Sequence, residues 1–433
     1  MYIQFGILVL SCQVFSVFSP IICRINPDIF FFVHPLSSLI VMSKSIQLEW
    51  PNKAIPNIDR PSKYYQHVVT KSPSLPPKKT IQLFWGDNWD ILLHLRAEQQ
   101  KFHLIYLDPP FCSDANYHQI LKNDDTSVQI LAYTDTLAPS EYLQFLYHRF
   151  IIFREILHDN GSILVHCDNH QSHHIRCLLE EVFGAANFRN EIIWHYTGGG
   201  RAKKYFSRKH DNIFWFSKSN SWTFNIDTIR QPYNKNSGYA KSGITAKSGK
   251  VYTPHPLGTP IDDTWNIPII NPMSKERVGY PTQKPLELIE KLILACSNEG
   301  DSILDPFLGS GTTAVASEKY KRQFTGCDLN INAIHCTMRR TEECAVYSAN
   351  PFPTILGDIT LNIQTEGANT AYHISCSSHT IQEIRILNTQ QQITHSSPSN
   401  SITVNQNTDI ATIQVVDLQG NLGNISWQSI QLL

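Results

Sequence analysis

The chain has 433 residues, enough for a large catalytic domain with one or two smaller modules. Hydrophobic residues make up 42% of it and charged residues 17%, which excludes a disordered chain and is typical of a globular enzyme. The formal net charge of −1 neither favours nor excludes a polyanionic partner, so only the distribution of charge is informative. The ten cysteines form no CxxC pair, which predicts reduced cysteines in a cytoplasmic protein and no zinc site.

The first segment, residues 1–41, is rich in Phe, Ile, Val and Leu, but polar residues and a proline interrupt it and no basic residue precedes it. A signal peptide requires a basic start, and a membrane-spanning helix requires about 20 apolar residues. We therefore interpret 1–41 as a mis-assigned extension upstream of a start at Met42, with a membrane anchor as the less favoured alternative, and we expect no membrane partner. Residues 42–79, which end in a Pro-rich run, are predicted to form an N-terminal arm and linker.

From about residue 80, short apolar runs alternate with helical patterns. The predicted strands are 81–85, 104–107, 162–166, 191–195, 212–217, 302–304 and 323–327, and the predicted helices are 140–157, 172–183, 285–297, 311–320 and 332–343. This alternation predicts an α/β fold with a mostly parallel, doubly wound sheet.

The alternation breaks at Gly198, and the catalytic domain is predicted to comprise 80–197 and 280–350 on either side of an insert, 198–279. From position 201 to position 250 the chain has eleven Lys or Arg against two Asp, so an electrostatic footprint for phosphates is expected in this insert. Residues 351–433 have one Arg against five acids and show period-two segments, which predicts a small β-rich appendage.

The first motif that carries chemistry is Leu104-Ile-Tyr-Leu-Asp-Pro-Pro-Phe111, in which a buried strand delivers Asp108 to its carboxyl end. Pro109 and Pro110 remove two N–H donors and fix the backbone, leaving rigid carbonyl acceptors. A carboxylate beside such a carbonyl accepts both hydrogens of an amino group, which turns the nitrogen lone pair toward an electrophile. Phe111 offers a face on which a base can stack.

The second motif is Ser302-Ile-Leu-Asp-Pro-Phe-Leu-Gly-Ser-Gly-Thr-Thr-Ala314, which is a strand, a glycine turn and a helix start. Gly309 and Gly311 allow close approach of a ligand to the backbone, and Asp328 follows where an acid can hold ribose hydroxyls. A nicotinamide dinucleotide satisfies this loose fingerprint too. Asp305 before the glycines favours an adenosyl cofactor, because it would meet an amino group rather than a pyrophosphate.

Together these motifs resemble the family of DNA amino-methyltransferases in which the Asp-Pro-Pro-Phe element precedes the cofactor element. The resemblance covers roughly 80–344 and implies a Rossmann-like methyltransferase fold that uses S-adenosylmethionine. Supporting stretches are 86–88, 161–168, 180–194, 209–215 and Tyr280-Pro-Thr-Gln-Lys-Pro285.

The resemblance implies two sets of site residues. The target base would be held by Asp108, Pro109, Pro110 and Phe111. The cofactor would be held by Asp87, Lys284, Asp305, Phe307, Gly309, Gly311, Thr312 and Asp328.

The basic insert lies where relatives of this motif order carry their target-recognition segment. Its cations suit phosphate contacts, and those expected to contact DNA are Arg201, Lys203, Lys204, Arg208 and Lys209. A solvated basic loop without a ligand is the alternative. A run of His166, Asp168, His170, His173 and His174 invites a metal, but methyl transfer from a sulfonium needs no Lewis acid, and we expect none.

These observations predict a site-specific enzyme that transfers a methyl group from S-adenosylmethionine to the exocyclic amino group of adenine in double-stranded DNA. The same reaction on cytosine is the nearest alternative. A nicotinamide-dependent oxidoreductase and a non-catalytic DNA-binding relative are alternatives from other classes. A restriction endonuclease partner and a homodimer stay open.

Overall fold

The computed structural model describes most of the chain between residues 47 and 426. The described ranges are 47–71, 81–110, 115–122, 127–135, 138–198, 200–234, 236–350, 359–366, 369–376, 381–387, 392–397, 401–405, 412–417 and 422–426. The predicted extension 1–41 lies outside the described residues. Within them, no helix has the length and apolar character that crossing a membrane requires.

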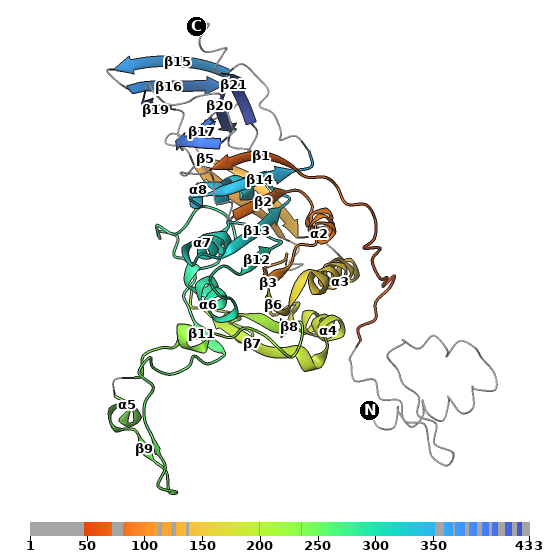
Figure 1. The fold of residues 1–433 in the computed structure, drawn as a ribbon, viewed down its shortest axis with the longest axis vertical. Coiled ribbons are helices and arrows are strands. Elements are labelled where there is room, and N and C mark those ends of the chain that lie inside the picture. Colours follow the sequence, from red (N-terminus) through yellow and green to blue (C-terminus); the bar gives the residue numbers. More distant parts are fainter. Residues whose placement is uncertain are drawn as a thin grey trace, which may run out of the picture.

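A single mixed sheet of fourteen strands runs through the described part of the chain (Figure 1). In order across it, the strands are β11 (Thr264–Asn266), β7 (Phe188–His195), β8 (His210–Ser217), β6 (Leu157–Cys167), β3 (Phe102–Leu107), β12 (Ser302–Asp305), β13 (Gln323–Asp328), β2 (Ile81–Trp85), β14 (Cys344–Ser348), β1 (Gln66–Lys71), β18 (Gln392–Ser397), β17 (Ile381–Leu387), β20 (Thr412–Asp417) and β21 (Leu422–Ser426). From β6 to β14 every neighbouring pair is parallel.

Helices cover both faces of this sheet (Figure 1). On one face lie α2 (Asn88–Ala97), α3 (Pro139–Ile156) and α4 (Ser172–Phe183), and on the other lie α6 (Leu286–Cys296), α7 (Thr312–Lys319) and α8 (Ile331–Arg340). The predicted doubly wound α/β class is therefore confirmed. The antiparallel pairs β6–β8 and β7–β8 make the sheet mixed.

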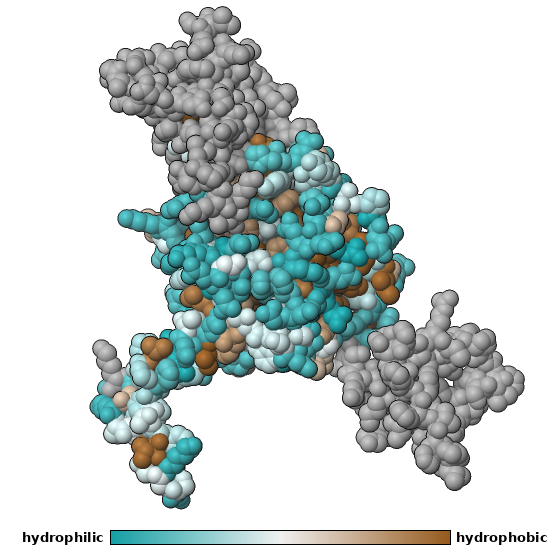
Figure 2. All heavy atoms as spheres, in the orientation of Figure 1, coloured by the Kyte–Doolittle hydropathy of each residue, from teal (hydrophilic) through white to brown (hydrophobic). Residues whose placement is uncertain are grey.

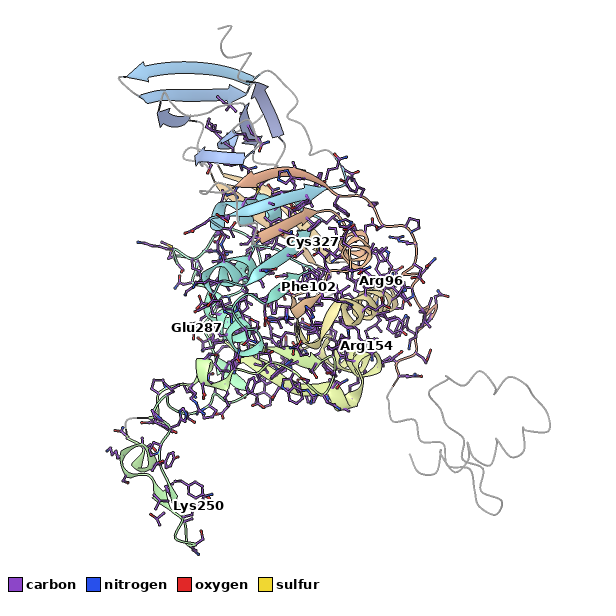
Figure 3. All side chains as sticks on the ribbon, viewed as in Figure 1. Arg96, Phe102, Arg154, Lys250, Glu287 and Cys327 are labelled. Atoms are coloured by element: carbon purple, nitrogen blue, oxygen red, sulfur yellow. The ribbon has the colours of Figure 1, made fainter. Side chains whose placement is uncertain are left out.

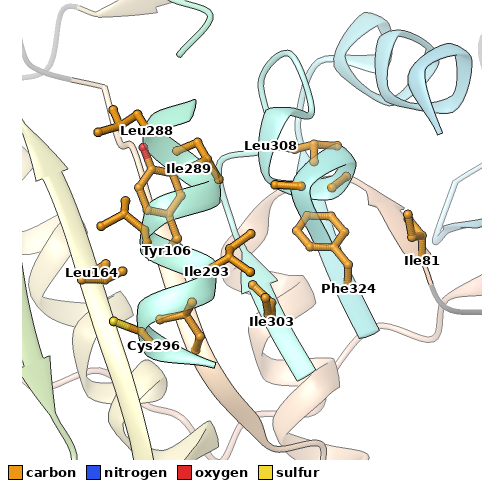
Figure 4. Close-up of a cluster of buried hydrophobic side chains, with 14 of the residues drawn as sticks. Ile81, Tyr106, Leu164, Leu288, Ile289, Ile293, Cys296, Ile303, Leu308 and Phe324 are labelled. Carbon is orange, nitrogen blue, oxygen red and sulfur yellow. The ribbon is translucent and has the colours of Figure 1, made fainter. Parts of the chain in front are cut away.

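Two hydrophobic cores follow from the two-residue period of the strands. On β3, Leu104 and Tyr106 belong to one core, and Ile105 and Leu107 belong to the other. Figure 4 shows the first, in which Tyr106 lies beside the α6 residue Ile289. Full burial of such side chains stabilises the fold by about 1.5–3 kcal/mol each, which fixes the strand ends that carry the site.

The range predicted as an insert contains two strands of the main sheet, β8 and β11. Between them η3 (Ile226–Ile229) packs on the body of the molecule through the buried Ile229, whereas α5 (Gly238–Ser242), β9 (Ile244–Thr245) and β10 (Val251–Tyr252) form an arm that projects from it (Figure 1). Lys250 lies near the far end of this arm (Figure 3). The arm carries exposed apolar side chains, among them Val251, and brown atoms lie along it in Figure 2.

Two further groups of strands lie outside the parallel core. The hairpin β4 (Ala115–Lys122) and β5 (Ser127–Asp135) follows the Asp-Pro-Pro segment. Toward the C-terminus β15 (Ile359–Glu366), β16 (Asn369–Cys376) and β19 (Ser401–Asn405) form a separate sheet, while β18 extends the main sheet by pairing with β1. The fully buried Arg385 of β17 donates to His335 of α8 at 2.8 Å, which joins this region to the catalytic core.

Candidate active site

Neighbouring parallel strands bring four acidic side chains to one edge of the sheet. Asp108 directly follows β3, Asp305 ends β12, and Asp328 ends β13. Asp87 follows β2 after one residue. Because the carboxyl ends of parallel strands share an edge, these acids meet although they are far apart in the sequence.

A cavity of about 350 Å³ opens at this edge. Most of the predicted base and cofactor residues line it, namely Asp87, Asp108, Pro109, Pro110, Lys284, Asp305, Phe307, Gly309, Thr312 and Asp328. Gly311 adjoins this lining without being part of it, and Phe111 lies outside the described residues.

The two oxygens of the Asp108 carboxylate have different environments. Oδ2 accepts a hydrogen bond from Lys284 Nζ at 2.6 Å, and the side chains of both residues are largely buried. Oδ1 is also buried and has no hydrogen-bond partner within the described ranges. A buried acceptor without a partner costs about 1–3 kcal/mol, and the residue that carries this acceptor lines the cavity.

The glycine turn after β12 packs tightly against α8 and the end of β13. Gly309 and Gly311 have φ of 51° and 78°, a region that side chains disfavour. A Cβ on Gly311 would lie 2.2 Å from Thr337 Oγ1, so glycine is required there. The N–H of Gly309 donates to Asp328 Oδ2 at 2.9 Å, which ties the turn to the end of β13.

Burial controls the ionisation of two acids in the cavity. It raises the pKa of Asp305 to about 7 and that of Asp328 to about 6. Backbone N–H groups oppose this rise, for example Phe307 N–H donating to Asp305 Oδ1 at 3.0 Å, but burial has the larger effect. A ligand that brings a cation or hydroxyl donors would stabilise the ionised forms.

The sequence did not identify Arg149, a buried cation on α3 that lines the cavity. Its guanidinium donates to Asn88 Oδ1 at 2.7 Å and to Asp87 Oδ1 at 3.2 Å. Asn88 in turn donates to the Pro306 carbonyl at 2.9 Å, so this network joins the segment after β2 to the glycine turn. The available signal was the position of Arg149, which falls on the apolar face of the 139–156 helix.

A second buried network lies behind the cavity. The Tyr106 hydroxyl contacts His166 Nδ1 at 3.0 Å, and His166 Nε2 contacts Asp211 Oδ2 at 3.2 Å. Tyr196 donates to the other Asp211 oxygen at 3.1 Å. Burial would raise the pKa of Asp211, but the hydrogen bond to His166 and the charge of Lys284 lower it. The network therefore keeps an anion close to the Asp108–Lys284 pair.

The histidines and aspartate considered as metal ligands have separate roles. His166 belongs to the buried network, whereas His170 pairs with Asp168 at the surface. The rings of His173 and His174 contact each other at a tilt of 40°, with centroids 3.9 Å apart. Among the described residues, no group of three His, Cys, Asp or Glu side chains is arranged to hold a metal.

The predicted DNA-contacting residues lie in the loop between β7 and β8. Arg201, Lys203 and Lys204 are exposed, whereas Lys209 donates to the carbonyl of Gly200 at 3.0 Å. Arg208 donates to His170 Nε2 at 2.8 Å. β8 is antiparallel to both β7 and β6, and β6 is parallel to β3. The loop that joins the end of β7 to the start of β8 therefore lies at the edge of the sheet where β3 ends and Asp108 follows.

The fold and the cavity define an α/β protein with a ligand site at the carboxyl edge of its sheet. The model of the DNA methylase family matches residues 102–339, which is more than half of the chain. The chain therefore belongs to this family of DNA amino-methyltransferases, which use S-adenosylmethionine, and DNA is the substrate that the family implies.

The chain is also similar to individual proteins and to solved structures. The chain is 31% identical over 250 residues to the type II methyltransferase M1.MboII of Moraxella bovis, a match that covers 55% of this chain and 89% of the relative. It is 27% identical over 266 residues to the DNA adenine methyltransferase YhdJ of Escherichia coli (strain K12), covering 61% and 83%. The crystal structure of an M1.HpyAVI–SAM complex is 21% identical with a TM-score of 0.41, covering 60% of this chain and 98% of that chain.

The raised pKa of Asp305 predicts how stability depends on pH. The folded state binds this proton up to about pH 7, whereas an unfolded aspartate releases it near pH 4, so this group makes the ligand-free protein less stable as pH rises from about 4 to 7. One pKa unit corresponds to about 1.4 kcal/mol. We therefore expect Asp305→Asn to raise stability at pH 8 by about 1 kcal/mol or more and by little at pH 4.

Urea unfolding at pH 4, 5, 6, 7 and 8, followed by tryptophan fluorescence without cofactor, measures this effect. Asp262→Asn is the matched control, because Asp262 is exposed and does not line the cavity. A gain in stability that is the same at every pH would contradict the assignment of the titration to Asp305.

Proposed function

We propose that this protein methylates the exocyclic amino group of adenine at a specific site in double-stranded DNA. The observation that supports this proposal is Asp108 Oδ1, a buried acceptor without a partner in the described chain, on a residue that lines the cavity. An amino group supplies the donor that this oxygen lacks. Family membership supports DNA as the source of that group, and the similarity to a relative named as an adenine methyltransferase favours adenine.

Free cysteines and a DNA substrate support a cytoplasmic location.

S-adenosylmethionine fits the chemistry of the cavity wall. It supplies an electrophilic methyl group on a positively charged sulfur. In the proposal Asp305 and Asp328 hold the amino and hydroxyl groups of this cofactor, while the glycine turn allows close approach and Phe307 offers an apolar face. Thr312 and Asp87 complete the wall. The ammonium of Lys284 is turned to Asp108, so Lys284 stands between the cofactor side and the base side.

The chain's contribution to the reaction is alignment. A paired base cannot reach the cavity, so the target nucleotide must leave the helix. Asp108 Oδ1 and a carbonyl of the Pro109–Pro110 segment would then accept the two amino hydrogens and turn the nitrogen lone pair toward the methyl group. Phe111, outside the described residues, would stack on the ring. Holding the reacting atoms about 3–3.5 Å apart accounts for most of the acceleration.

Transfer of tritium from labelled S-adenosylmethionine to unmethylated plasmid DNA tests the proposed substrate. After digestion to nucleosides, we expect the label in N6-methyladenine. Asp108→Ala should lower the transfer rate roughly 100-fold or more while cofactor affinity changes little, because the proposed cofactor contacts lie on other strands. Label in N4-methylcytosine alone would overturn the choice of base, and undiminished transfer by the alanine variant would overturn the role of Asp108.

The proposed phosphate contacts predict a change in salt dependence. Arg201, Lys203 and Lys204 are exposed, so their charges are available to DNA. Each phosphate neutralised contributes a slope of about −0.9 to log K against log salt. Replacing Lys203 and Lys204 with Ala should therefore weaken binding to duplex DNA and reduce the slope by about 1.8.

Fluorescence anisotropy with a labelled duplex between 50 and 300 mM salt measures this slope. The control is the double variant Lys319→Ala and Lys321→Ala, because Lys319 ends α7 and Lys321 lies just before β13, at the opposite edge of the sheet. Equal slopes for wild type and the Lys203 and Lys204 variant would rule out these contacts.

A further inference from the structure

Hydrogen bonds hold the base of the loop between β7 and β8 in place. Arg208 donates to His170 Nε2, and His170 Nδ1 therefore donates to Asp168, the residue that follows β6. Lys209 donates to the carbonyls of Gly198 and Gly200, on the other limb of the loop. These contacts use two of the predicted DNA cations and part of the histidine run to hold the loop.

The end of this loop presents aromatic side chains to solvent. Phe206 has a relative exposure of 98%, the highest among the large hydrophobic side chains of the described residues, and its neighbour Tyr205 has 65%. A single exposed apolar residue is ordinary on a protein surface. Here the two aromatics are adjacent and follow Lys203 and Lys204, on a loop whose base is fixed.

An apolar tip among cations fits one class of partner best. A polyanion attracts the lysines, but only a polyanion with an apolar interior can take up the ring of Phe206. Double-stranded DNA has both features, since phosphates lie outside and stacked bases lie inside. Side chains such as Phe insert between base steps in several DNA-binding proteins and unstack them.

The position of the loop relative to the base site supports this partner. β8 is two strands away from β3 in the sheet, which corresponds to about 10 Å at the usual spacing of strands. Asp108 follows β3, and the loop enters β8 at the same edge. The loop that carries Phe206 therefore enters β8 about 10 Å from the strand end that carries Asp108.

We propose that Phe206 inserts into the DNA stack and fills the space that the target nucleotide vacates when it turns into the cavity beside Asp108. This inference rests on the proposed function, because it requires that a base leaves the helix. The ring replaces stacking that the flipped base loses, so it stabilises the flipped state. Phe206 thus acts on the availability of the base and does not touch the reacting groups.

The test compares two duplexes that carry the methylation site mapped by sequencing DNA treated with the wild-type enzyme. In one the target base is normally paired, and in the other it faces an abasic position, so that leaving the stack is easier. In single-turnover reactions with tritiated S-adenosylmethionine, we expect Phe206→Ala to be at least tenfold slower than wild type on the paired duplex. On the abasic duplex the two should agree within threefold, and Phe206→Trp should stay near wild type on both.

Tyr64→Ala is the matched control, because Tyr64 is an aromatic residue that is 76% exposed and lies before β1, outside the predicted insert. It should match wild type on both duplexes. Wild-type rates for Phe206→Ala on the paired duplex, or an equal loss on both duplexes, would overturn the insertion. An inactive wild type would instead contradict the proposed function itself. Thermal unfolding of each variant confirms that the fold is intact.

Discussion

The ion pair between Asp108 and Lys284 joins the two sides of the site. Asp108 follows β3, whereas Lys284 comes from the segment that enters α6, 176 residues later. The pair occupies Oδ2 of the carboxylate and leaves Oδ1 buried without a partner in the described chain. A carboxylate held by one oxygen on a buried cation has a fixed orientation. In the proposed reaction, the direction in which the amino group approaches Asp108 would therefore be set before any ligand binds.

The electrostatics of the cavity match a positively charged cofactor. Its wall carries the carboxyl groups of Asp87, Asp108, Asp305 and Asp328 against two cations, Arg149 and Lys284. Both cations already contact acids of the wall. Burial raises the pKa of Asp305 and Asp328, which reduces the negative charge on these two carboxyl groups. A sulfonium with amino and hydroxyl groups would relieve this cost by favouring the ionised carboxylates, which links cofactor binding to the preparation of the site.

Local patterns sufficed to predict seven strands of the main sheet, the glycine turn and the acids at the strand ends, because apolar periodicity and glycine placement act over a few residues. The strands β1, β11 and β14 and the hairpin β4–β5 were not predicted. Helix α2 was missed, and its short amphipathic run beside the Asp-Asn pair explains why. The Arg149 network, the pairing of Asp108 with Lys284 and the chain from Tyr106 to Asp211 depend on contacts between distant segments. The histidine run suggested one cluster, whereas the strand-to-helix turn separates His166 from His170.

The most direct test of the account is a double-mutant cycle on the Asp108–Lys284 pair, measured as the single-turnover rate of methyl transfer to duplex DNA at saturating cofactor. If Lys284 acts by orienting Asp108, Lys284→Met should lower the rate about 10- to 100-fold, and combining it with Asp108→Asn should cost little more than Asp108→Asn alone. Lys284→Arg should recover part of the loss. Rate losses that simply multiply in the double variant would show that the two residues act independently and would contradict the central place given to this ion pair.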